Sequence, residues 1–190
     1  SFIVATAMAA RLGNVDVAAH EVAFQAWFFL AMSMDAIAIA AQALIGNLLG
    51  AGNAHEARKI GQRAIIWSIG IGVFTGSFLA IFHVPFAEIF SEDTAVIELA
   101  SFLLLHVAIM APLSGVAFAL DGILIGAGDQ RFLAKAMSLS AVISIPLMLL
   151  TVTFGLGIGW IWGSIWIFIL VRSTTLYFRF RSDKWQKLGS

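Results

Sequence analysis

The chain has 190 residues, of which 61% are hydrophobic and 12% charged, and its mean hydropathy is +0.96. A soluble domain carries charge on roughly a quarter of its residues, so this composition predicts an integral membrane protein whose exterior faces the lipid bilayer. The 11 basic residues balance the 11 acidic ones, which gives no indication of nucleic-acid binding, and the absence of cysteine excludes disulfides, thiolate metal sites and Cys nucleophiles.

The first predicted element is a short apolar run that ends at Arg11. A spanning helix needs about 20 residues, and a signal peptide would begin with Met and a basic segment. We therefore expect residues 1–12 to be the end of a truncated helix and the chain to be the C-terminal piece of a longer protein. A short interfacial segment is the alternative.

Five longer apolar runs follow, each long enough for a helix that crosses a bilayer. A helix satisfies its backbone hydrogen bonds within one segment, so we expect an all-α, polytopic helix bundle. The expected spans lie near residues 22–49, 62–83, 98–126, 134–154 and 160–178, and a tail at 179–190 follows them.

Positive charge lies almost entirely on one side of the predicted bundle, and Arg11 alone is on the other side. The positive-inside rule then predicts a cytoplasmic C-terminus and two cytoplasmic Gly-rich loops, with the loops at 84–96 and 155–159 facing out. The ten basic residues on the predicted inner side are Arg58, Lys59, Arg63, Arg131, Lys135, Arg172, Arg179, Arg181, Lys184 and Lys187.

Aromatic residues gather near both predicted membrane interfaces. Trp160, Trp162 and Trp166 lie near the outer one, and Tyr177 and Trp185 near the inner one. Such positions are typical of aromatic belts, so we interpret these residues as interface anchors.

An internal repeat links two of the spans. Residues 43–53 (ALIGNLLGAGN) match residues 119–129 (ALDGILIGAGD) at seven of eleven positions. Each copy ends in a Gly-Ala-Gly turn, where Gly closes one helix and Asn or Asp caps the next. The match upstream of the turn favours a shared origin or shared packing, and internal repeats are common in transporters. We expect packing or turn roles for Gly46, Gly50, Gly52, Gly122, Gly126 and Gly128, because small residues let helix backbones approach closely.

Asp35 is the first candidate for a functional side chain. It lies in the middle of its span with no Lys or Arg within ten residues on either side. A charge at that depth costs about 2.5–3.5 kcal/mol, so such residues face an interior or a cavity. Gln42 follows two helical turns along the same face. We interpret Asp35 as a carboxyl that takes up a proton or a cation; a protonated, purely structural Asp is the alternative.

Asp121 is the second candidate, because it occupies the position of Ile45 in the repeat. It is an acid added to one copy of a common scaffold, within about two turns of the helix end. We expect it to be solvated or paired with Arg131 or Lys135, and structural and functional interpretations both stay open.

The remaining polar residues indicate no catalytic or metal chemistry. His20 and Glu21 are expected to lie at the N-terminal end of their helix, where an acid is favourable and capping is the simplest role. His83 and His106 lack the spacing of metal ligands, and the chain has no Walker loop, Ser/His/Asp set or zincin motif. We predict no metal site, no catalytic residue and no enzyme activity.

Three segments and two turns carry a family resemblance: residues 17–23 (VAAHEVA), 35–46 (DAIAIAAQALIG) with the turn at 50–53, and 120–124 (LDGIL) with the turn at 126–129. Together they resemble the multidrug and toxic compound extrusion (MATE) family, and its bacterial DinF-like branch most closely. The resemblance implies a multi-pass protein of the bacterial cell membrane with twelve helices in two lobes. This chain would be the C-terminal lobe, and its partner would be the missing N-terminal lobe of the same polypeptide.

The resemblance also implies a function: export of small cationic, amphipathic compounds in exchange for protons or sodium ions, with no other cofactor. In the DinF-like branch the acid tied to proton coupling lies in the lobe that this chain lacks. In other branches acids of the C-terminal lobe bind the cation, so we hypothesise that Asp35, with Gln42, lines the central cleft.

Two other functions remain as alternatives. A flippase for lipid-linked saccharides would line its cleft with basic residues, whereas here the membrane interior holds no Lys or Arg apart from Arg172, near the end of its span. A non-transporting membrane subunit would pair its acids with the cations of a partner.

Overall fold

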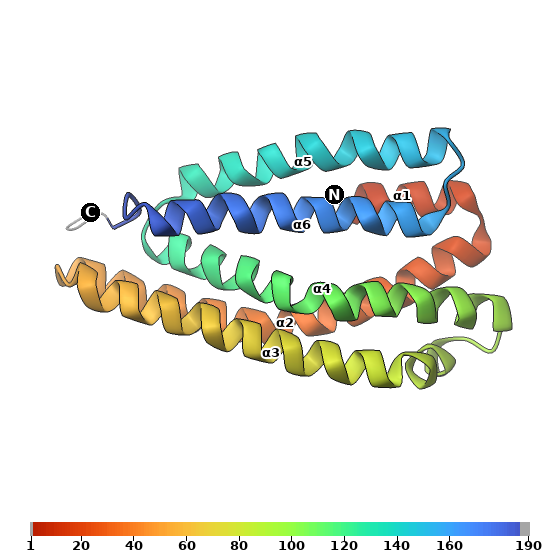
Figure 1. The fold of residues 1–190 in the computed structure, drawn as a ribbon, viewed down its shortest axis with the longest axis horizontal. Coiled ribbons are helices and arrows are strands. Elements are labelled where there is room, and N and C mark those ends of the chain that lie inside the picture. Colours follow the sequence, from red (N-terminus) through yellow and green to blue (C-terminus); the bar gives the residue numbers. More distant parts are fainter. Residues whose placement is uncertain (1, 187–190) are drawn as a thin grey trace.

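The computed structural model describes residues 2–186 as an all-helical bundle (Figure 1). The prediction of five helices long and apolar enough to cross a membrane, preceded by a shorter one, is confirmed. The helices are α1 (Phe2–Leu12), α2 (Asn14–Gly50), α3 (Ala54–Phe90), α4 (Thr94–Gly126), α5 (Gln130–Thr153) and α6 (Ile158–Arg181).

The helices extend beyond the apolar runs that predict them. α2 and α3 have 37 residues each, which is about 55 Å of helix against a hydrocarbon core of about 30 Å. Side-chain caps support two of these extensions: Asn53 accepts a hydrogen bond from the Glu56 N–H at 3.2 Å, and Asp93 accepts one from Ala95 at 2.9 Å. Polar residues at the ends therefore continue the helices past the membrane interior.

α3 differs from the prediction of a long loop at 84–96. Its backbone leaves helical geometry at Phe82, with φ −107° and ψ 18°, and then continues as a helix to Phe90. Pro85 lies three residues later and lacks the N–H that would bond the preceding turn, which accounts for the kink. The connection to α4 shrinks to residues 91–93.

α4 is the central helix and packs against α2, α3, α5 and α6 (Figure 1). Its most apolar stretch is 61% buried, against 28% in α2, α3 and α5. Glycines make the contact with α3 close: a Cβ on Gly72 would lie 2.7 Å from the Ala111 carbonyl oxygen, and one on Gly115 would overlap the backbone of Ser68. Close backbone packing of this kind is the usual means of helix association in lipid.

The two Gly-Ala-Gly turns and the C-terminal segment lie at the same end of the bundle (Figure 1). Ion pairs tie that end together. Arg179 donates to Asp129 at 2.6 Å, and its guanidinium lies 4.9 Å from the centre of the Phe132 ring. Arg58 at the start of α3 pairs with Asp183 after α6. These contacts use the acids and bases of the predicted inner side to join α3, α5 and α6.

Two of the predicted interface anchors are instead core residues. Trp162 is fully buried on α6, and Trp185 is fully buried, stacks on Phe180 and donates its indole N–H to the Phe180 carbonyl at 2.8 Å. Trp160 is 61% exposed, as an anchor would be. Composition near an interface does not say which helix face a Trp occupies, so the interpretation was wrong for Trp162 and Trp185.

His20 is not near a helix end, because α2 begins at Asn14, well before the apolar run. Its ring is fully buried, with Nε2 3.0 Å from the Thr6 hydroxyl and the ring centre 5.7 Å from that of Trp162. The acid in the first turn is Asp16. The proposed N-terminal role of His20 and Glu21 is therefore wrong, and His20 joins α1, α2 and α6.

Candidate functional site

A buried ion pair joins α4 and α6 inside the bundle. The Arg172 guanidinium donates to Asp121 Oδ2, and the two side chains are only 18% and 14% exposed. The expected partners Arg131 and Lys135 are both exposed at the start of α5, so that pairing is wrong. α6 packs along α4, whereas α5 makes few contacts with it, and helix packing decides the partner.

The ion pair does not satisfy every polar atom of its two side chains. Asp121 Oδ1 and Arg172 Nε are buried, and neither has a hydrogen-bond partner among the described residues. A carboxylate can accept several hydrogen bonds or a bidentate cation, and a buried charge that is only partly satisfied is costly. Asp121 can therefore accept a second cationic or hydrogen-bonding group without first releasing Arg172.

Asp35 lies on α2, which packs against α4, the helix that carries Asp121. Its side chain is exposed and makes no ion pair or hydrogen bond with the described residues. Lipid is a poor neighbour for a carboxylate in the middle of a spanning helix. The face of α2 around Asp35 is thus suited to a water-filled cleft or to further protein.

Close packing of α2 on α4 brings these two acids together. A Cβ on Gly122 would overlap the carbonyl oxygen of Ala38, and one on Gly126 would overlap that of Gln42. Gly122 is adjacent to Asp121, and Ala38 is three residues after Asp35, so this crossing sets the separation of the carboxylates. Gln42 is half-buried there, with its backbone against α4.

The other glycines of the repeat have different surroundings. A Cβ on Gly46 would lie 3.3 Å from the Gly126 carbonyl oxygen, a tight but tolerable contact, while Gly50 has open space around it. Gly52 and Gly128 have φ angles of 77° and 69°, which L-residues with side chains rarely adopt. These two are turn residues and not packing residues.

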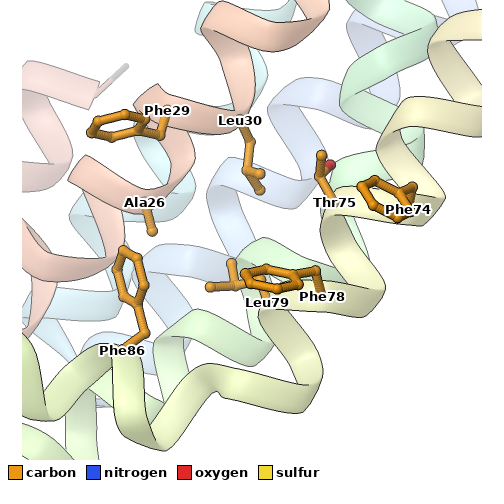
Figure 2. Close-up of a pocket in the computed structure, with 8 residues that line it drawn as sticks. All are labelled: Ala26, Phe29, Leu30, Phe74, Thr75, Phe78, Leu79 and Phe86. Atoms are coloured by element: carbon orange, nitrogen blue, oxygen red, sulfur yellow. The ribbon is translucent and has the colours of Figure 1, made fainter.

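An apolar cavity of about 330 Å³ lies between α2 and α3. Figure 2 shows Ala26, Phe29 and Leu30 from α2 facing Phe74, Phe78 and Phe86 from α3. Its one polar side chain is Thr75, whose hydroxyl donates to the Ile71 carbonyl at 2.8 Å. The cavity can therefore hold a hydrophobic or aromatic body but offers no charge. Sequence reasoning missed it, although Phe74 and Phe78 repeat at helical spacing.

No group of three or more His, Asp or Glu side chains within residues 2–186 is arranged to hold a metal ion. His83 and His106 each bond a backbone carbonyl of their own helix, at 2.8 and 3.1 Å. Three of the ion pairs in the described part of the chain join a carboxylate to a guanidinium group.

Known proteins resemble this chain along its whole length. A profile of the MatE family matches residues 1–150. Protein DETOXIFICATION 44, chloroplastic, of Arabidopsis thaliana is 32% identical over 196 residues, which cover 100% of this chain and 36% of that protein. A probable multidrug resistance protein NorM of Pasteurella multocida is 34% identical, and so is multidrug resistance protein MdtK of Cronobacter sakazakii; each match covers 68% of this chain and 28% of the relative.

The chain thus spans about a third of the length of the curated relatives that it matches. Those relatives come from a plant and from bacteria, so they do not single out the DinF-like branch, which stays a prediction. The family match covers well over half of the chain, and the fold is the bundle of spanning helices that a membrane transporter requires. The chain belongs to the MatE family of membrane transporters.

Proposed function

We propose that this chain is the C-terminal lobe of a secondary active transporter that exports small cationic, amphipathic compounds in exchange for protons or sodium ions. Membership of the MatE family and the relatives named as multidrug resistance proteins support an efflux role. The chain spans about a third of those relatives, which supports a second lobe in the same polypeptide as its partner.

One observation carries the proposal: two closely packed spanning helices each carry a carboxylate, Asp35 exposed on α2 and Asp121 held by Arg172 on α4. An antiporter needs a site that a substrate cation and a coupling ion cannot occupy together. A carboxylate meets that need, because a proton, a sodium ion and an organic cation all compete for the same negative charge. Asp35 would meet the cation in the cleft, and Asp121 would respond through its charge.

Arg172 gives this site its own counter-cation. When the cleft holds no cation, the guanidinium keeps Asp121 neutralised inside the bundle. A cation that reaches the unused Asp121 Oδ1 would weaken the attraction between Asp121 and Arg172, so binding would shift α6 relative to α4. Alternating access by a rocking of lobes requires a coupling of this kind between ion occupancy and helix packing. Because Arg172 is paired with Asp121, it is not free to bind a pyrophosphate, which counts against the flippase alternative.

The aromatic cavity between α2 and α3 supplies the second half of an amphipathic binding site. Its Phe side chains would take the hydrophobic body of a substrate, with the charge directed toward Asp35. Aromatic faces also attract organic cations. The basic residues at the end with the Gly-Ala-Gly turns support a cytoplasmic C-terminus in the cell membrane.

The test uses the full-length protein in inverted membrane vesicles, with a fluorescent organic cation and an imposed proton or sodium gradient. Wild type is compared with Asp35→Asn and with Glu92→Gln, which removes an exposed acid outside the spans. We expect gradient-driven uptake in wild type and Glu92→Gln and its loss in Asp35→Asn. Unchanged transport in Asp35→Asn removes this carboxylate from the mechanism, and no transport by wild type under either gradient contradicts antiport.

A further inference from the structure

A groove of about 560 Å³ lies between α3 and α6, at the end of the bundle that carries the Gly-Ala-Gly turns. Arg58 from the start of α3 and Arg181 from the end of α6 line its mouth. Ile65, Ile66 and Tyr177 line it farther along the helices. The groove therefore changes from cationic to apolar as it runs from the helix ends toward the middle of the spans.

The two arginines have unequal ties to the rest of the protein. The Arg58 guanidinium bonds Asp183 through one nitrogen and lies 6.0 Å from the centre of the Phe180 ring. Arg181 is exposed and has no ion pair or hydrogen bond with the described residues. An anion placed between the arginines would therefore meet one partly used and one unused guanidinium.

The apolar part of the groove is open to its surroundings. Ile66 is 68% exposed and Tyr177 is 44% exposed, although both lie on spanning helices. A soluble anion has no apolar part that could contact these residues. A molecule with a phosphate at one end and hydrocarbon at the other matches both parts, because Arg binds phosphate oxygens and apolar side chains pack on acyl chains.

We propose that this groove binds an anionic phospholipid, with the phosphodiester between Arg58 and Arg181 and an acyl chain along Ile65, Ile66 and Tyr177. The lipid would bridge α3 and α6, which lie close together at Gly61 and Phe180. This site requires only that the bundle sits in a membrane, so it stands apart from the export of cations.

Asp183 is bonded to the Arg58 guanidinium, so it would compete with the lipid phosphate for that group. Its backbone has a φ of 56°, a left-handed conformation that Asn adopts as readily as Asp. Asp183→Asn therefore removes the competing charge while it preserves the local backbone. An anionic lipid should bind more tightly to this variant, whereas a role of Arg58 in folding alone predicts no gain.

The experiment titrates delipidated full-length protein in mild detergent with dioleoylphosphatidylglycerol or dioleoylphosphatidylcholine, and native mass spectrometry counts the bound lipid. We expect preference for the anionic lipid, a loss of about fivefold in its affinity in Arg181→Gln, and a gain in Asp183→Asn. Arg131→Gln is the control, because Arg131 is exposed at the same end but does not line the groove.

Three outcomes would overturn the proposal. Equal binding of the two lipids removes the role of the charge. Equal losses in Arg181→Gln and Arg131→Gln reduce the effect to general surface charge, and unchanged binding in both Arg181→Gln and Asp183→Asn shows that another part of the polypeptide covers the groove. Competition by soluble glycerol phosphate as effective as that by the lipid identifies a simple anion site instead.

Discussion

The turn after α2 and the turn after α4 have the same backbone hydrogen bonds at corresponding positions. Ala51, Gly52 and Asn53 donate to the carbonyls of residues 47, 49 and 48, and Ala127, Gly128 and Asp129 donate to those of 123, 125 and 124. The middle Ala has nearly the same conformation in both copies. Identical residues thus produce an identical turn twice.

The copies differ where their sequences differ. Ile45 is fully buried in the apolar core, whereas Asp121 at the equivalent position pairs with Arg172. Asn53 caps α3, whereas Asp129 makes no cap and pairs with Arg179. Both acids of the second copy bind arginines of α6, so the repeat has acquired charge only where a sixth helix supplies the partner.

The largest effect should come from removing the ion pair that Asp121 of the second copy makes with Arg172. Arg172→Leu leaves Asp121 as an uncompensated, largely buried carboxylate, and we expect a loss of about 3 kcal/mol in stability. The double variant Asp121→Ile/Arg172→Leu restores the residue of the first copy and should recover most of it. Unfolding of the full-length protein by SDS titration measures the stability of both variants, and a loss in the double variant as large as that in Arg172→Leu would contradict the pairing.

The next effect concerns the packing glycines. Gly122→Ala places a Cβ against the carbonyl of Ala38, so α2 and α4 must separate, at a cost of about 2 kcal/mol. Gly50→Ala has open space and should be neutral or slightly stabilising, because Ala is the better helix former. Thermal unfolding of the two variants gives the comparison, and equal midpoints would refute the close crossing.

Exchanging the residues that follow the turns should have unequal effects. Asp129→Asn weakens a buried, charge-assisted hydrogen bond to Arg179, and we expect a loss of about 1.5 kcal/mol. Asn53→Asp keeps an oxygen that can cap α3 and should change stability by only a few tenths of a kcal/mol. The same SDS titration distinguishes them, and equal losses would show that both residues act as caps.

The smallest effect should be the same in both copies. Gly52→Ala and Gly128→Ala each force an L-residue into the left-handed region with no new contact, at a cost of about 1 kcal/mol. Chemical denaturation of the single variants and of the double variant should give equal and additive losses. A clear difference between the copies would mean that the turns are not equivalent.

The spans were predictable because lipid imposes a simple rule on composition and length. The turn conformations followed from Gly in the third position of Gly-Ala-Gly, and the structure has the positive φ angles there. The kink at Phe82 is not predictable in this way, because Pro85 lies at the edge of the apolar run, where the sequence predicts a loop.

The partner of Asp121 could not be predicted from nearby sequence. Arg131 and Lys135 are closer along the chain, but Arg172 lies 51 residues away and meets Asp121 through the packing of α6 on α4. The burial of Trp162 depends on the same unknown, which is the rotation of each helix about its axis. A sequence shows which helix faces are apolar. In lipid nearly every face is apolar, so this pattern does not give the rotation of a helix.

The most direct test of the proposed exchange between substrate and coupling ion measures binding of a fluorescent organic cation to the purified full-length protein. Binding is measured at pH 8 and pH 6, with and without sodium. We predict that protons or sodium weaken cation binding severalfold in wild type and in Glu92→Gln, and that this competition disappears in Asp35→Asn. If Asp35→Asn shows the same ion dependence as wild type, the carboxylate of α2 is not where substrate and coupling ion compete.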